Sequence, residues 1–206
     1  HETEVKIPIA DLAAIRKKLR KAGFRAAQRR AFEDNVLFDL PGRPLRAIRA
    51  VLRLRHYGRR WVLTYKGTPE ADTLYKSRIE YESEIVHPEA VRHIFRSLGL
   101  VPVFRYQKYR THFVGEEELR RVASARRKPR KPSFEIALDE TPIGTFIELE
   151  GSRAAIDRAA RMLGFSTEDY STKSYGALYL EQCQVQGIEP GEMVFAVQPR
   201  GHKLSL

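Results

Sequence analysis

Charged and apolar side chains alternate one by one over residues 2–7, which read ETEVKI. Successive side chains of a β-strand point to opposite faces, so Glu2, Glu4 and Lys6 would share one face of a strand. An ordinary strand with one face in water gives the same pattern. This segment therefore predicts a strand, but it does not decide what the charged face contacts.

The same alternation returns in five later segments, at residues 52–55, 64–66, 78–85, 106–113 and 147–150. An open sheet would turn the charged face to water and pack helices on the apolar face, whereas a closed sheet would form a barrel lined with charge. Such a lining is costly unless its charges are paired or bound to ions. Across the six segments the charged face would carry Glu2, Glu4, Lys6, Arg53, Arg55, Lys66, Arg78, Glu80, Glu82, Glu84, Lys108, Arg110, His112, Glu148 and Glu150.

The mixture of signs on this face indicates which ligand could compensate a charged lining. Arginine and lysine bind phosphate oxygens, and the arginine fork does so with two parallel hydrogen bonds. Carboxylates bind Mg²⁺, which in turn bridges phosphate oxygens. The pattern therefore favours a metal–polyphosphate complex over a bare anion or a bare metal ion.

Apolar residues recur at helical spacing over residues 9–22, 88–98 and 152–163, and a glycine follows each stretch. Glycine commonly ends a helix, so each stretch predicts one helix with a defined end. A further helix is expected over residues 174–185, and residues 51–66 predict a hairpin. No linker divides the chain, so we expect a single α+β domain over residues 1–187 and a tail over residues 188–206.

The 206 residues carry a formal net charge of +11, which predicts an anionic partner: nucleic acid, a phosphorylated small molecule or an acidic surface. No apolar run approaches the ~18 residues of a membrane span. The single cysteine, Cys183, cannot form an internal disulfide, which favours the cytoplasm as the location. The histidines show no metal-ligand spacing, and Trp61 and Tyr65 are expected to make packing contacts.

Seven lysines and arginines crowd between residues 120 and 131, next to Pro129 and Pro132. Prolines within a charge run are typical of an exposed loop, so we expect a basic loop insertion at about residues 120–133. It could be a solvated insertion, cover a site that binds anions, or contact nucleic acid. The last is disfavoured because no aromatic residues are interleaved to stack on bases.

The first segment, Glu2-x-Glu4-x-Lys6, resembles the ExExK signature of the CYTH, or triphosphate tunnel metalloenzyme, superfamily. This superfamily includes class IV adenylyl cyclases, thiamine triphosphatases and inorganic triphosphatases. Further motifs follow in the family's order and cover nearly the whole chain. They are LRxR at residues 52–55, TYKG at 64–67, RxExE at 78–82, KxR at 108–110, LD…GxFxExE at 138–150 and KSY at 173–175.

The resemblance implies a closed, antiparallel, eight-stranded β-barrel, or triphosphate tunnel, with helices packed outside. It implies two bound Mg²⁺ or Mn²⁺ ions, with Glu2, Glu4, Glu148 and Glu150 as ligands and Glu80 and Glu82 as second candidates. Catalytic roles are expected for Glu80, Glu82, Lys6 and Arg55. The residues expected to bind triphosphate are Lys6, Arg53, Arg55, Lys66, Arg78, Lys108, Arg110 and Lys173.

Several functions remain open on this evidence. The first is metal-dependent hydrolysis of inorganic, thiamine or nucleoside triphosphate, and the second is formation of cyclic AMP and pyrophosphate from ATP by a class IV adenylyl cyclase. A non-catalytic module that binds polyphosphate or a nucleotide is the third, and nucleic-acid binding through the net positive charge is the least favoured. We expect a small-molecule triphosphate as the partner and no membrane contact, with a homodimer left open.

Overall fold

The computed structural model describes residues 1–72, 74–124 and 132–196. Its nine strands are β1 (Glu2–Ile9), β2 (Phe24–Asp39), β3 (Val51–Tyr57), β4 (Arg60–Lys66), β5 (Lys76–Arg78), β6 (Glu80–Ile85), β7 (Val101–Gly115), β8 (Phe134–Thr141) and β9 (Gly144–Gly151). Its helices are α1 (Leu12–Lys21), α2 (Pro44–Ala47), α3 (Pro88–Ser97), α4 (Glu116–Ser124), α5 (Arg153–Leu163) and α6 (Tyr175–Gln186), with a short 3₁₀ turn at Thr167–Asp169.

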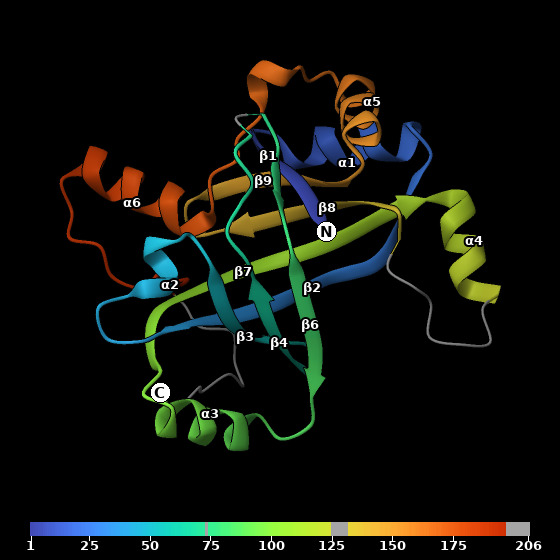
Figure 1. Cartoon of the computed structure of the whole chain (residues 1–206). Helices are drawn as coiled ribbons and strands as arrows, with labels where there is room; N and C mark the ends of the chain where they lie inside the picture. The colour runs from blue at the N-terminus through green and yellow to red at the C-terminus, as the bar shows by residue number, and fades with distance from the viewer. Residues whose placement is uncertain (73, 125–131, 197–206) are drawn as a thin grey trace.

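All neighbouring strands pair antiparallel in the order β5-β1-β9-β8-β7-β2-β3-β4-β6. The two edge strands, β5 and β6, are separated in the chain by Ile79 alone. β5 pairs with β1 and β6 pairs with β4, so this bent segment connects the two edges of the sheet. The result is a nearly closed antiparallel barrel, which confirms the predicted α+β barrel with its helices outside (Figure 1).

The predicted count of eight strands becomes nine because the chain bends at Ile79. The carbonyl oxygen of Ile79 accepts a hydrogen bond from the backbone nitrogen of Gly67 at 2.9 Å, just beyond the end of β4. This bond extends the pairing of β4 with β6 to Ile79, the residue next to Arg78, where the pairing with β1 ends. If β5 and β6 are counted as one bent strand, the barrel has the expected eight.

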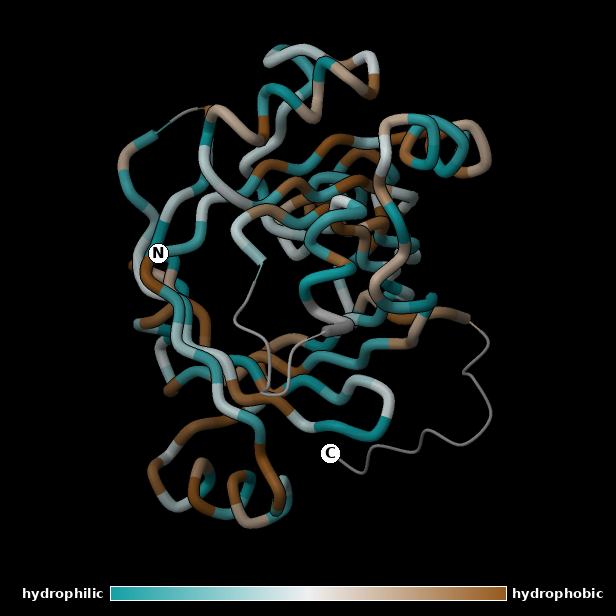
Figure 2. Tube along the Cα trace, turned by 90° about the vertical axis from the view of Figure 1, so that its right-hand side faces the viewer, coloured by the Kyte–Doolittle hydropathy of each residue, from teal (hydrophilic) through white to brown (hydrophobic). Residues whose placement is uncertain are grey.

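The apolar faces of the strands point outward, and helices cover those of β1, β9, β2 and β3, whereas Tyr81 on β6 is exposed. Val5 and Leu149, on β1 and β9, are fully buried in one cluster with Ile15 and Leu19 of α1 and with residues of α5. A second cluster joins β2 and β3 to Phe95 of α3. Hydrophilic and hydrophobic residues alternate along the strands in Figure 2, as expected when one face meets helices and the other lines the interior.

The helices that cover the barrel begin and end close to the predicted positions. Asp11 and Ser152 cap α1 and α5 through their side-chain oxygens, which accept hydrogen bonds from backbone nitrogens three residues on. Gly164 ends α5 with a φ of 85°, a conformation that favours glycine. None of the described helices is long and apolar enough to span a membrane.

The basic loop expected from about residue 120 is partly helical. Arg120 and Arg121 lie in α4, and the Arg121 side chain donates to Glu118, one turn earlier, at 2.6 and 2.9 Å. Glutamates in the first turn and arginines in the last stabilise such a helix through its dipole. Residues 125–131, which carry the other basic residues of this run, lie outside the described part of the chain, as do residues 197–206 of the tail.

Candidate functional site

The barrel encloses a central cavity of about 500 Å³. Seven glutamates and nine lysines or arginines line it, together with a few aromatic and apolar side chains. Period-two alternation explains this lining, because the apolar face of each strand is used by the helices outside. Every residue predicted to act in the site lines the cavity except Lys173.

Lys173 lies outside this lining in the described structure. Its side chain is exposed, and its ammonium nitrogen is 2.8 Å from a carboxylate oxygen of Glu181 on α6. The next two residues do reach the cavity: Ser174 caps α6, and Tyr175 is buried. The KSY segment therefore contributes to the cavity wall through its last two residues.

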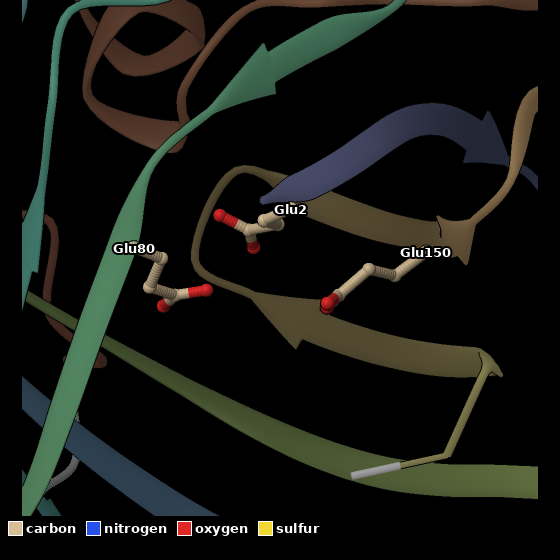
Figure 3. A group of neighbouring side chains, drawn as sticks. All are labelled: Glu2, Glu80 and Glu150. Carbon is tan, nitrogen blue, oxygen red and sulfur yellow. The ribbon is translucent and has the colours of Figure 1, made fainter.

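Three of the cavity glutamates form a group that could hold a metal ion. Oxygens of Glu2, Glu80 and Glu150, from β1, β6 and β9, lie within 4.8 Å of one another, and the three carboxylates point toward a common centre (Figure 3). Oxygen ligands of this kind suit Mg²⁺ or Mn²⁺. β1 and β6 are not neighbours in the strand order and lie toward its opposite ends. The near closure of the barrel therefore brings Glu2 and Glu80 together.

The other two predicted metal ligands, Glu4 and Glu148, are joined by a lysine. The Lys6 ammonium lies 2.8 Å from Glu4 and 3.0 Å from Glu148, and Lys76 lies 3.1 Å from Glu4. Burial opposes the charged form of Lys6, but Glu148 and Glu4 outweigh it and raise the lysine pKa. The structure therefore divides the predicted set into a carboxylate group around Glu2 and Glu150 and an ion-paired group around Lys6.

Lys66 contacts the carboxylate group directly. Its ammonium lies 2.7 and 2.6 Å from the two oxygens of Glu2 and 3.1 Å from Glu80. Burial, which disfavours the charged form, and the nearby Glu4 raise the pKa of the Glu2 carboxyl, and Lys66 offsets part of that rise. The pKa of Lys66 is raised in spite of burial by Glu2, Glu4 and Glu80, so the lysine stays charged.

In the part of the wall formed by β7, β8 and β9, buried carboxylates form ion pairs with lysine and arginine side chains that face the cavity. Lys108 donates to Asp139 at 2.9 Å, and Arg110 contacts both Asp139 and Glu148. Burial disfavours the charged form of Arg110, but Asp139 and Glu148 raise its pKa well above the usual value. Fixed cations of this kind are prepared to bind phosphate oxygens without rearrangement.

Arg53 is oriented by neutral and charged partners together. Its guanidinium donates to the Tyr106 hydroxyl and to Thr64, both at 3.1 Å, and lies 3.5 Å from Glu82. Arg55 lies 3.8 Å from the same oxygen of Glu82, which places the two predicted arginines side by side around one carboxylate. Glu82 thus pairs with arginines in this structure, and it is not in the group with Glu2.

The predicted set of site residues lacks two buried acids, Asp139 and Glu33, that contact the cavity cation Lys108. Asp139 belongs to the LD segment of the resemblance, but no role was assigned to it. Glu33 is fully buried, lies 3.5 Å from Lys108 and 3.7 Å from Arg55, and accepts no side-chain hydrogen bond within the described residues. Glu33 alternates with Asn35 and Leu37 along β2, and Leu37 lines the cavity, so period-two alternation is the signal that could have identified Glu33.

His112 lies at the cavity wall, whereas Trp61 packs on the outside of the barrel. His112 contacts Glu135 at the cavity wall, and the described residues contain no histidine–cysteine group able to bind zinc. Trp61 packs outside the barrel against the cluster that includes Leu54 and stacks on His56 with ring centroids 4.6 Å apart.

Comparisons with known proteins agree with this architecture. A protein of Methanocaldococcus jannaschii named as a putative adenylate cyclase is 29% identical over 163 residues, covering 79% of this chain and 83% of the relative. The structure of a putative adenylate cyclase from Vibrio parahaemolyticus superposes with a TM-score of 0.68 at 19% identity, covering 84% of this chain and 94% of that one. A Hippeastrum protein, described as a putative adenylyl cyclase with a dominant triphosphatase activity, superposes with a TM-score of 0.56 at 19% identity, covering 92% and 98%.

The sequence model of the CYTH domain matches residues 1–175, which include every strand and all helices but most of α6. This match covers most of the chain and the complete barrel with its charged cavity. The chain therefore belongs to the CYTH domain family.

Proposed function

We propose that this chain is a divalent-metal-dependent triphosphatase that binds its substrate inside the barrel. The observation that carries the proposal is the position of the Glu2, Glu80 and Glu150 group within the same cavity as nine lysines and arginines. A site for a bare anion gains nothing from clustered carboxylates, and a site for a bare metal gains nothing from that many cations. Both kinds of group are useful together when the ligand is a triphosphate with its metal.

The balance of charge around the cavity supports the same choice. With the buried acids Glu33 and Asp139, which contact the cavity cations, the acidic groups number nine and match the lysines and arginines. A bare triphosphate carries roughly four negative charges near neutral pH, which this neutral wall would not compensate. Divalent cations that accompany the triphosphate would supply the missing positive charge.

The protein's own residues would then bind and orient the phosphate chain. Lys108 and Arg110 are fixed by Asp139, and Arg53 is fixed by Tyr106 and Thr64, so these donors would meet phosphate oxygens in set positions. Glu2, Glu80 and Glu150 would hold a divalent ion. Such an ion, when bound, neutralises phosphate oxygens and assists formation of the nucleophile.

Water is our preferred nucleophile, because it is always available, whereas cyclisation requires an oriented ribose hydroxyl. The description of the Hippeastrum protein as having a dominant triphosphatase activity is consistent with this preference. Attack of water on the terminal phosphorus would break the bond to the bridging oxygen and release orthophosphate. Positioning and charge neutralisation account for most of the catalysis in reactions of this type.

A class IV adenylyl cyclase is the second candidate. Leu37, Val51 and Phe104 line part of the cavity and offer an apolar surface that a nucleobase could contact. The Methanocaldococcus and Vibrio relatives carry names of this class. In this reaction the ribose 3′-hydroxyl would attack the innermost phosphorus and pyrophosphate would leave.

A product assay distinguishes these candidates. The protein would be incubated with ATP, inorganic triphosphate or thiamine triphosphate, each with Mg²⁺, Mn²⁺ or a chelator, and the products separated. We expect orthophosphate from at least one substrate, only when metal is present. Cyclic AMP and pyrophosphate from ATP would support the cyclase instead, and triphosphate binding without any product would favour the non-catalytic module.

A further inference from the structure

Lys66 lies where a metal ion would have to bind. Its ammonium contacts both oxygens of Glu2 at 2.7 and 2.6 Å and one oxygen of Glu80 at 3.1 Å. These two glutamates are two of the three members of the carboxylate group that could hold a metal. One positively charged side chain therefore already neutralises part of that group.

The lysine ammonium and a divalent ion compete for the same oxygens. Mg²⁺ and Mn²⁺ require carboxylate oxygens at distances near 2 Å, and a bidentate hydrogen bond from Lys66 occupies both oxygens of Glu2. Two positive charges held within a few ångströms in a buried site repel each other strongly. The metal would bind well only after the Lys66 ammonium has moved away from Glu2.

A triphosphate would supply the alternative partner that Lys66 needs. Lys66 lines the cavity at the end of β4, opposite the glutamates of β1, and a four-carbon chain lets its ammonium move while the backbone stays in the sheet. Arg110 differs, because its guanidinium is held by Asp139, which is not part of the carboxylate group. Among these cations, Lys66 is well placed to exchange a metal-binding carboxylate for a phosphate oxygen.

We propose that Lys66 acts as an internal counter-ion that blocks the carboxylate group against divalent ions until a triphosphate draws its ammonium away. Metal and triphosphate then bind cooperatively, each raising the affinity for the other, as linkage requires. The site would reject free metal ions and accept the metal–triphosphate complex. This inference rests on the triphosphate site proposed above.

The test is Mn²⁺ binding without any phosphate compound, measured from the loss of the free-ion electron paramagnetic resonance signal at pH 7. Lys66→Met and Lys66→Gln remove the charge, and we expect each to raise Mn²⁺ affinity about tenfold or more over the unchanged protein. Lys66→Arg keeps a charged donor and should leave the affinity close to that of the unchanged protein. Two neutral variants are used so that the result survives if one of them fails to fold.

Lys76→Met is the matched control. It also removes a lysine charge from the cavity, but Lys76 contacts Glu4 at 3.1 Å, which is outside the carboxylate group. Burial lowers the pKa of Lys76 to about 8, so the residue is mostly charged at the pH of the test. We expect its removal to change Mn²⁺ affinity by less than about threefold, because only general electrostatics is altered.

The inference is overturned if the neutral Lys66 variants bind Mn²⁺ no more tightly than the unchanged protein, or if Lys76→Met raises the affinity equally. Neither result depends on catalysis. Failure to form any product would reject the proposed triphosphatase and leave the Mn²⁺ comparison valid. If product forms normally but the Lys66 variants do not change metal affinity, only the counter-ion role of Lys66 is rejected and the proposed triphosphatase stands.

Discussion

The Arg110 guanidinium donates two hydrogen bonds to the Asp139 carboxylate, at 2.6 and 2.5 Å, inside the barrel. Lys108 and the Tyr175 hydroxyl donate to the same carboxylate at 2.9 and 2.6 Å. One buried acid thus orients two of the cations that face the cavity and links them to α6. Its role is to hold the cations in place, since its oxygens are already occupied by protein donors.

Asp139→Ala should be strongly destabilising. Removing it leaves Arg110 and Lys108 buried with fewer acidic partners, and breaking a buried pair in this way costs about 3–5 kcal/mol of unfolding free energy. Urea unfolding followed by circular dichroism would measure the change. Glu140→Ala is the adjacent control: Glu140 pairs at 2.9 Å with the exposed Arg30, so we expect a loss of only about 1 kcal/mol or less. Equal losses in the two variants would contradict the assigned role of Asp139.

Stability should fall in acid partly through Glu148. Burial favours the neutral acid, but Arg110 and Lys6 outweigh it and lower the Glu148 pKa to about 2, from a usual value of 4.5. The folded state therefore binds this proton less readily than the unfolded state. The resulting stabilisation, on the order of 3 kcal/mol, is complete above pH 4.5 and lost as the pH falls through the folded value.

Urea unfolding at several pH values between 5 and about 2 tests this dependence. Glu148→Gln should be less stable than the unchanged protein at neutral pH and should lose less stability as the pH falls. If the free energy of unfolding falls equally with pH in the two proteins, Glu148 does not contribute to the loss of stability in acid.

Glu150→Gln should impair activity while leaving the fold intact. Glu150 belongs to the carboxylate group with Glu2 and Glu80 and is only partly buried, so an amide can replace it without large strain. We expect kcat with Mg²⁺ or Mn²⁺ to fall about 100-fold or more, on the scale seen when one electrostatic group of a site is removed. The melting temperature should change little.

Glu84→Gln is the control for Glu150. Glu84 lies on the same face of β6 as Glu80, but it is exposed and does not line the cavity. Its kcat should stay within about twofold of the unchanged protein, as expected for a surface substitution. A similar loss of activity in both variants would indicate a general effect of acidic charge and would remove Glu150 from the metal group.

Lys173→Ala tests where the KSY segment acts. Because Lys173 pairs with the exposed Glu181 outside the cavity lining, we expect its loss to weaken triphosphate binding by less than about threefold. Arg53→Ala, which removes a buried cation of the cavity, should weaken binding far more. Isothermal titration with inorganic triphosphate compares them, and a larger effect at Lys173 would mean that the lysine leaves Glu181 when ligand binds.

Alternation along single strands was enough to predict a charged face shared by six segments, whereas the closed barrel was predicted from the resemblance to the CYTH superfamily. Alternation works because each strand has only two faces, and helices with apolar stripes at the predicted positions can cover only one of them. Alternation predicts that Glu2, Glu4 and Lys6 share one face of β1, and in the structure that face lines the cavity. Local pattern is sufficient to assign the two faces of a strand, because this assignment depends on nothing beyond the strand itself.

The grouping of side chains inside the barrel could not be predicted in the same way. Glu2 meets Glu80 only because the chain bends at Ile79 and pairs its two halves with different strands. Lys6 meets Glu148 because the register of β1 and β9 places the two residues opposite each other, and alternation leaves that register undetermined. Glu33 was missed for a smaller reason, since none of the motifs that carry the family resemblance includes it.

The pairing of β1 with β5 and β9 also affects how the chain can fold during its synthesis. β1 is made before both of its partners, because β5 and β9 are translated about 75 and about 145 residues later. The ribosome therefore releases β1 with both edges unpaired, and the carboxylate group around Glu2 can form only after Glu150 has emerged. We expect nascent chains that end before Glu150 to remain sensitive to protease in this region and to lack the metal group, so that the barrel closes as a single event after β9 has been translated.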